Sequence, residues 1–265
     1  MRWRKMTLSA VLGILLSILI GGGFPESSAQ PNQALDLAKP ELRDIIRASG
    51  FITAKPLPSW GSITATKEAA LNLTEGEVVY LQLERGKNVQ PGDRFSIVRL
   101  GKAVTHPLTK KNLGHRVMVP GELTILEGKD QVALAKINKS FQPILRGDMV
   151  IPFQPVLPQI LSIPPQKKIE GTVLLSTEEA ENISEREFVF IDRGNQDGVV
   201  VGDLFSIYQK GNSSGEIPKS EEEKLPMVKV GEVVVVSVQE ETSTALVTHS
   251  AQSIYAGDRV VSGKE

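Results

Sequence analysis

The chain has 265 residues, a formal net charge of −1 and no cysteine. The lack of cysteine excludes disulfides, Cys-ligated metal sites and lipid attachment at a lipobox. With 30 basic and 31 acidic residues and no basic face, the composition argues against a nucleic-acid partner.

Residues 1–29 have the pattern of a secretory signal peptide. A basic start (Arg2–Lys5) precedes the apolar run Leu8–Ile20, and Ser27–Ala29 is typical of a cleavage site. We expect cleavage after Ala29 and export of the remainder. The alternative is an uncleaved membrane anchor, but the apolar run is short for the ~20 residues that a span needs.

Residues 30–60 form a lead-in to the rest of the chain. Within it, Pro40–Ala48 predicts a short helix, with proline in the first turn. Leu42, Ile45 and Ile46 lie on one face of that helix, and we expect this face to dock on the first of the two repeats described next.

The dipeptide Gly-Asp occurs four times, always 55 residues apart. The stronger period is 110 residues, because residues 61–151 align without a gap on residues 171–261. Two copies of so long a unit indicate tandem domains rather than a solenoid. The four copies are Gly92-Asp93, Gly147-Asp148, Gly202-Asp203 and Gly257-Asp258.

These dipeptides have a structural and a functional interpretation. Glycine supplies a positive φ, and aspartate can accept hydrogen bonds from backbone N–H groups of the same turn. Alternatively, the aspartates form a carboxylate site for a metal or for acid–base chemistry. The fixed spacing favours turns in a repeated fold.

Each repeat predicts about six short strands, from enrichment in Val, Ile, Phe and Thr, alternation of apolar residues, and Gly- or Asp-bearing turns. We therefore expect an all-β chain with two tandem small closed β-barrels, residues 61–153 and 171–265, joined by a Pro-rich linker, residues 154–170. The strands are expected near residues 62–66, 78–83, 94–99, 117–125, 132–137 and 149–152, and near 172–176, 188–192, 204–208, 228–238, 244–248 and 259–261.

Two long segments between the third and fourth strands are the candidate binding loops. We expect residues 211–225, rich in Ser, Lys and Glu, to be a solvated spacer. Residues 101–115 are the stronger candidate for binding, because long loops on a rigid barrel often bind partners. The candidate binding residues are Thr105, His106, Pro107, Thr109 and His115, together with Trp60, the one tryptophan after the signal segment.

Neither a metal site nor a catalytic site is predicted. His106 and His115 have no third ligand at a supporting spacing. The chain contains no Gly-x-Ser-x-Gly elbow, phosphate-binding loop or His-Glu-x-x-His motif. We expect a protein that is not an enzyme and has no cofactor.

Several stretches resemble a known bacterial group. These are Gly50-Phe51-Ile52, Pro91-Gly92-Asp93-Arg94-Phe95, His106-Pro107-Leu108-Thr109 with Leu113-Gly114, Val189-Phe190-Ile191-Asp192 and Thr242-Ser243-Thr244-Ala245-Leu246-Val247. They resemble the region downstream of the LysM module in LysM peptidoglycan-binding domain-containing envelope proteins of Gram-negative bacteria. Residues 30–60 are too short to hold a LysM module, and Lys110 stands where that group often has glycine.

The second repeat also resembles two other groups. One is the C-terminal domain of flagellar assembly protein T, and the other is the β-domain of the rod shape-determining scaffold protein, through Asp192–Val199. All three resemblances imply small periplasmic β-domains without enzymatic activity, and the last two imply protein binding.

Three hypotheses follow for the function. The first is a periplasmic, envelope-associated binding or assembly module that engages a protein partner through barrel loops. The second is a peptidoglycan-binding protein without a LysM module, although aromatic residues for sugar stacking are few. The third is a hydrolase that uses His106 and an aspartate. No membrane span is expected after the signal segment, and the sequence leaves the oligomeric state open.

Overall fold

The computed structural model describes residues 40–66, 73–155, 160, 167–211 and 225–263. The predicted signal peptide with its cleavage site at Ala29, most of the predicted linker and most of the 211–225 segment lie outside the described residues. Within the described residues the chain is mostly β-strand, and none of its helices is long and apolar enough to cross a membrane.

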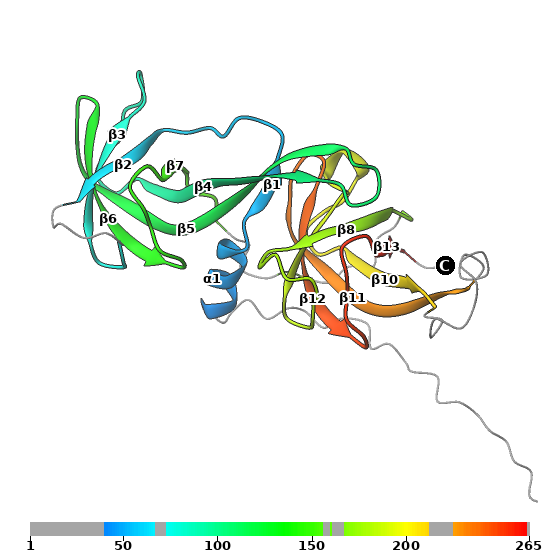
Figure 1. Ribbon diagram of the computed structural model, residues 1–265. Helices are drawn as coiled ribbons and strands as arrows, with labels where there is room; N and C mark the ends of the chain where they lie inside the picture. Colours follow the sequence, from blue (N-terminus) through cyan, green and yellow to red (C-terminus); the bar gives the residue numbers. More distant parts are fainter. Residues whose placement is uncertain (1–39, 67–72, 156–159, 161–166, 212–224, 264–265) are drawn as a thin grey trace, which may run out of the picture. The chain divides into compact units, whose positions relative to one another are not determined.

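The lead-in consists of a helix, α1 (Pro40–Ala48), and a short strand, β1 (Phe51–Thr53) (Figure 1). The first repeat contributes β2 (Gly61–Thr66), β3 (Val78–Leu83), β4 (Arg94–Thr105), β5 (Asn112–Lys129), β6 (Val132–Ser140) and β7 (Met149–Pro152). The second contributes β8 (Glu170–Ser176), β9 (Phe188–Ile191), β10 (Leu204–Lys210), β11 (Met227–Val238), β12 (Ser243–Ser250) and β13 (Arg259–Ser262), with a 3-10 turn at Asn195–Asp197.

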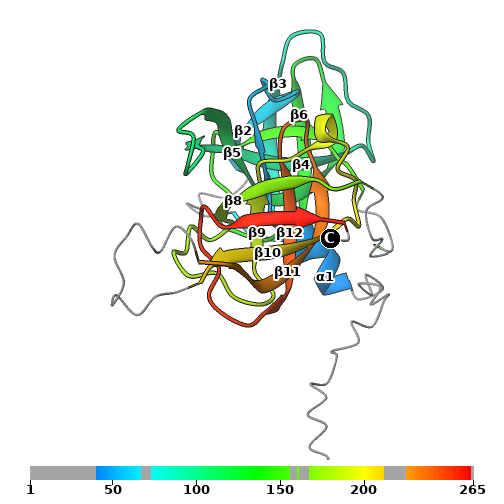
Figure 2. The same cartoon turned by 90° about the vertical axis from the view of Figure 1, so that its right-hand side faces the viewer.

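The second repeat is a closed barrel of six antiparallel strands in the order β10-β11-β12-β9-β8-β13. Figure 2 shows β8, β13, β10 and β11 following one another around it. Because successive side chains of a strand alternate in direction, one set from every strand fills the interior. Val189, Phe205, Ile207, Val233 and Val260 are fully buried there.

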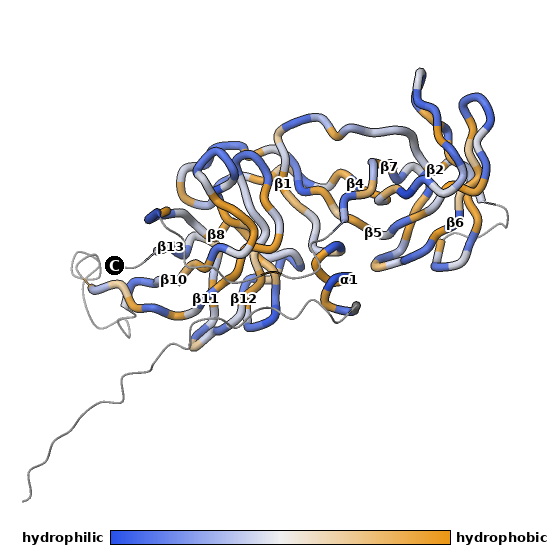
Figure 3. Tube along the Cα trace, turned by 180° about the vertical axis from the view of Figure 1, so that it is seen from behind, coloured by the Kyte–Doolittle hydropathy of each residue, from blue (hydrophilic) through white to orange (hydrophobic). Residues whose placement is uncertain are grey.

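The first repeat is a ring-like sheet with the order β1-β5-β4-β7-β2-β3-β6, and β5 also pairs with β6. Without β1, its pairings match those of the closed barrel in the second repeat strand by strand. Its core is a separate apolar cluster that includes Leu81, Phe95, Ile97, Leu123 and Ile137. In Figure 3, apolar residues recur along the strands of both repeats, as two such cores require.

The two repeats correspond residue by residue at an offset of 110. The isolated bridge between Leu73 and Ile144 in the first repeat has its counterpart between Ile183 and Ile254 in the second. Equivalent hydrogen bonds also have equal lengths, as for Gly92 N–H to Ile125 O and Gly202 N–H to Val235 O, both 2.9 Å. The internal repeat of the sequence is therefore an internal repeat of the fold.

All four Gly-Asp dipeptides form the same turn. The glycines have φ between 92° and 102°, and each aspartate carboxylate accepts the N–H of the residue three positions earlier, at 2.7–2.9 Å. Two turns that we did not predict use the same hydrogen bond with glutamate as acceptor, at Gly76-Glu77 and Arg186-Glu187. Among the described residues, each repeat thus has three such turns.

The turn carboxylates differ in what else they contact. Asp148 receives two hydrogen bonds from the Arg99 guanidinium, at 2.7 and 2.6 Å. At the equivalent position Asp258 receives one from Gln209, at 2.6 Å. Among the described residues, the Asp203 carboxylate accepts a hydrogen bond only from Val200 N–H. Burial raises the pKa of both Asp203 and Asp258, and the hydrogen bonds that they accept offset part of this rise.

We predict opposite effects of Asp148→Asn and Asp203→Asn, although both variants keep an oxygen to accept the turn N–H. At pH 7, Asp148→Asn should lower the free energy of unfolding by about 2 kcal/mol, because Arg99 loses its charged partner. Asp203→Asn should raise it, because a buried carboxylate no longer has to ionise in the folded state.

Urea unfolding at two pH values checks the sign. Because the folded pKa of Asp203 lies above the unfolded value of about 3.9, its ionisation lowers the stability as pH rises through that interval. The gain from Asp203→Asn should therefore be present at pH 7 and absent below about pH 3.5. Equal destabilisation by the two variants at pH 7 would contradict this account.

The packing of helix α1 differs from the prediction that its apolar face docks on the first repeat. Its apolar side chains do not dock on the first repeat; Ile46 and Leu42 pack in a cluster with side chains of the second repeat, and Ile45 is exposed. The partners from the second repeat are Phe188, Val234, Val236 and Leu246, all buried. At the equivalent positions the first repeat has Val78, Thr124, Leu126 and Lys136, a more polar surface that offers the helix less apolar area to bury.

Polar contacts join α1 to the first repeat instead. Arg47 lies 3.3 Å from the buried carboxylate of Glu122, and Asp44 lies 3.4 Å from Lys139. Arg94 pairs with the same Glu122 at 3.0 Å. The helix therefore contacts both repeats, one through apolar packing and the other through charge.

Candidate functional site

The predicted loop 101–115 is largely not a loop. Strand β4 continues to Thr105 and β5 begins at Asn112, so that only residues 106–111 connect them. Two irregularities of register, between Leu100 and Ala103 and between Ala103 and Thr105, break the alternation of side chains. β-Bulges of this kind interrupt the regular alternation of apolar and polar residues along a strand. The sequence pattern therefore did not predict the extended hairpin.

His106 lies at the tip of this hairpin and is only 6% exposed. Its Nδ1 accepts the N–H groups of Leu108 and Thr109, at 3.1 and 3.2 Å. Its Nε2 lies 3.0 Å from Oδ2 of Asp192 in the second repeat. With two donors directed at Nδ1, the proton belongs on Nε2, which donates to Asp192. Both ring nitrogens are therefore engaged within the protein.

Asp192 is held by further donors. Its Oδ1 accepts the Thr172 N–H at 2.5 Å, and its Oδ2 also accepts a hydrogen bond from Arg193 at 2.9 Å. A buried carboxylate needs such partners, because burying it unpaired would be costly. The hydrogen bond from His106 thus adds a third donor to a carboxylate that Thr172 and Arg193 of the second repeat already hold in place.

The apolar contacts around this pair come from three parts of the chain. Ile52 of β1, Val104 and Leu113 of the hairpin, and Leu174 and Phe190 of the second repeat form one buried cluster. The hairpin and β1 therefore cover an outer face of the second repeat.

Strand β1 is inserted between the two repeats. On one edge it pairs with β5, Phe51 opposite Val117. On the other edge, the hydroxyls of Thr242 and Thr244 donate to the carbonyls of Ile52 and Gly50, both at 3.0 Å. Because both threonines are buried, these bonds satisfy carbonyls that the solvent does not reach.

Ion pairs surround this junction with one consistent polarity. Basic residues of the lead-in and the hairpin meet acidic residues of the second repeat: Lys55 with Glu240, Lys111 with Glu241 at 2.9 Å, Lys102 with Glu179 at 2.9 Å, and Arg116 with Glu179 at 3.2 Å. The hydrogen bond from Lys102 lowers the pKa of Glu179, and the bond from Lys55 lowers that of Glu240. The lysines of these pairs are exposed, so each of their pairs contributes little to stability.

The remaining predicted binding residues do not form one surface. Thr105, Thr109 and His115 are exposed on the hairpin, and Pro107 is half-buried. Trp60 packs on the core of the first repeat, with its ring 5.4 Å from that of Phe95 and the Lys87 ammonium 4.9 Å above it.

No group of three or more His, Asp or Glu side chains in the described part of the chain is arranged to hold a metal ion.

The first repeat has a face equivalent to the one that the hairpin covers. At an offset of 110, Phe190 corresponds to Tyr80, Thr242 to Val132 and Thr244 to Leu134. No described residue outside the first repeat covers this face, and Tyr80 and Val132 are 38% and 47% exposed. The sequence analysis did not predict this face. Once the covered face of the second repeat is known, the offset of 110 residues identifies its equivalent in the first.

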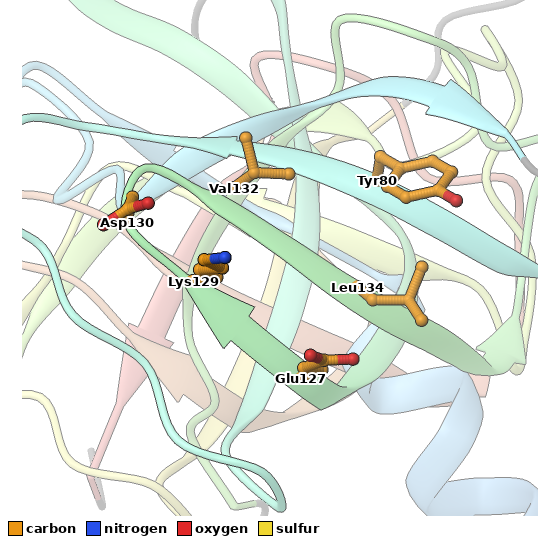
Figure 4. Close-up of a pocket in the computed structure, with 6 residues that line it drawn as sticks. All are labelled: Tyr80, Glu127, Lys129, Asp130, Val132 and Leu134. Atoms are coloured by element: carbon orange, nitrogen blue, oxygen red, sulfur yellow. The ribbon is translucent and has the colours of Figure 1, made fainter.

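A hollow of about 460 Å³ marks this place (Figure 4). Its six lining residues, which we call the uncovered face, are Tyr80, Glu127, Lys129, Asp130, Val132 and Leu134. Leu134 lies opposite Tyr80 on β3 and opposite Glu127 on β5, and Val132 lies opposite Lys129. The face therefore has an apolar centre with charged residues of both signs around it.

No protein-family model matches the chain. An uncharacterized protein of Aquifex aeolicus (strain VF5) is 36% identical over 112 residues, which is 42% of this chain and 18% of that protein. The chain thus spans less than a fifth of the curated relative that it matches.

We predict that His106→Ala destabilises the protein by about 2 kcal/mol, because the Asp192 carboxylate and two backbone N–H groups lose a buried partner. His115→Ala is the matched control, since His115 lies on the same hairpin but is exposed, and it should change stability by less than about 0.5 kcal/mol. Urea unfolding followed by circular dichroism measures both. Equal stability of the His106 variant and the wild type would show that the pair does not hold the hairpin.

Proposed function

We propose that the chain is an exported, non-enzymatic module of the cell envelope that binds a protein partner. In this proposal it consists of two small closed β-barrels, and its binding surface is the uncovered face of the first. The observation that carries the proposal is the repeat itself: the equivalent face of the second repeat binds a β-strand and a hairpin within the same molecule. The first repeat presents the equivalent face of the same strand arrangement, with different side chains.

The composition of the uncovered face suits a polypeptide ligand. Tyr80, Val132 and Leu134 offer apolar area to bury, and an aromatic with a polar tip is common in protein interfaces. Glu127 and Asp130 are placed to meet basic side chains, as Glu240 and Glu241 do at the covered face. Asp130 occupies the position equivalent to Glu240.

Two further observations support a binding role over the rivals. Both ring nitrogens of His106 are engaged within the protein, which weakens the case for His106 as the general base of a hydrolase. Trp60 is engaged by Phe95 and Lys87, which weakens the case for a glycan-stacking platform. The signal-like residues 1–29 support export, and the resemblances support the periplasm as the destination.

We predict that a photo-reactive phenylalanine analogue at Val132 forms protein adducts in cells that express the full chain. The same analogue at Glu185, an exposed turn residue of the second repeat, should not. Adding Tyr80→Ser should reduce the Val132 adduct roughly tenfold, because it removes an aromatic from the centre of the face.

A sedimentation assay separates protein from cell-wall binding. The purified chain should stay in the supernatant when peptidoglycan sacculi are pelleted at moderate salt. Pelleting with the sacculi, together with equal labelling at Val132 and Glu185, would contradict the proposal and favour peptidoglycan as the ligand.

A further inference from the structure

The uncovered face offers outward side chains to a ligand, but no free strand edge. Residues 132–136 of β6 pair with β3 on one edge and with β5 on the other. Because the main-chain groups of these residues are already used within the sheet, a ligand strand cannot add to β6 by main-chain pairing. Recognition at this face therefore depends on side chains.

The side chains at the centre of the face are poorly suited to hold an extended strand. At the covered face, the hydroxyls of Thr242 and Thr244 donate to two carbonyls of the lead-in. Val132 and Leu134 stand at these positions and have no donor, and Tyr80 adds one hydroxyl to the face. A strand docked in the same way would bury carbonyl groups without partners, which is unfavourable.

A helix does not have this requirement. Its backbone groups bond to one another except at its ends, so it can be bound through apolar side chains alone. The second repeat receives α1 in this way, on a surface that includes Val234, Val236 and Leu246. Leu126, the first-repeat equivalent of Val236, lies in the equivalent β-bulge and is 43% exposed. The first repeat thus has an exposed apolar side chain at a position where the second repeat binds a helix.

From this arrangement we propose that the uncovered face binds an amphipathic helix of a partner protein. The inference rests on the proposed function and names the class of its ligand. Apolar side chains three and four positions apart on the helix form one stripe, which packs on Tyr80, Val132 and Leu134. Tyr80 and Val132 are 38% and 47% exposed, so they have apolar area to bury.

The charged residues beside the apolar centre specify what flanks the stripe. Glu127 and Lys129 lie opposite Leu134 and Val132, so both project from the same face of β5 (Figure 4). Two positions along a strand span about 6.7 Å, and four positions along a helix span about 6 Å. A basic and an acidic residue one turn apart on the helix therefore match Glu127 and Lys129.

Two peptide display libraries test the proposal against the purified full chain. Both have the same composition and a length of about 18 residues, or five helical turns. One library places its apolar residues at helical spacing, and the other places them at alternate positions, as in a strand. Selection should enrich binders from the helical library, with a basic and an acidic residue four positions apart beside the apolar stripe.

Variants of the chain show where a selected helical peptide binds. Val132→Glu should weaken its binding roughly tenfold or more, because it places a charge at the centre of the face. Val200→Glu is the matched control, since it changes an exposed valine of the second repeat and should have no effect. Circular dichroism spectra equal to that of the wild type show that the variants fold.

A charge exchange tests the flanking residues. Glu127→Lys combined with Lys129→Glu should also weaken binding of the selected peptide, and a peptide with its two charges exchanged should recover it. Recovery requires that the peptide lies along β5, so equal binding of both peptides to both forms of the chain would contradict the proposed orientation.

The outcomes separate this inference from the proposed function. Enrichment from the alternating library, alone or equally with the helical one, would overturn the helix as ligand and keep a polypeptide-binding face. Binders from neither library, or helical binders that Val132→Glu does not weaken, would also overturn it, and protein adducts at Val132 would then still support the proposed function. Absence of both binders and adducts would exclude both.

Discussion

The docking of the β4–β5 hairpin on the second repeat is the contact on which the described structure depends. At its centre, the buried imidazole of His106 donates to Asp192 and accepts two backbone N–H groups. A buried polar pair adds little net stability over apolar packing, but an alternative arrangement would leave it unsatisfied. The pair therefore fixes where the hairpin docks, while the surrounding apolar cluster supplies the area that is buried.

The two repeats use one scaffold in two ways. Equivalent strands, bridges and turns recur at an offset of 110, so the interiors are alike. The outer faces differ: Phe190 and Asp192 are part of a buried junction on one face, whereas Tyr80 and Gln82 leave the other accessible and only partly apolar. Such a surface is compatible with reversible binding, because burying it releases less free energy than burying the covered face.

Much of the scaffold could be predicted from the sequence, because repeats and turns are local or periodic signals. The Gly-Asp turns followed from spacing, and the two sets of strands followed from enrichment in Val, Ile, Phe and Thr and from alternation of apolar residues. The sequence analysis did not predict the turns at Glu77 and Glu187, because it considered only aspartate as the side-chain acceptor of the turn. Periodicity gave α1 an apolar face but did not say which repeat it covers. His106 and Asp192 are 86 positions apart, and no spacing rule pairs such residues.

The most direct test of the account is native-state amide hydrogen exchange at Leu108 and Thr109, whose N–H groups donate to His106. If the hairpin is held on the second repeat, both amides exchange far more slowly than a free peptide, and Asp192→Asn accelerates both of them. Exchange at the free-peptide rate in the wild type would show that the tip is not docked, and the covered face would lose its role as the template for the uncovered one.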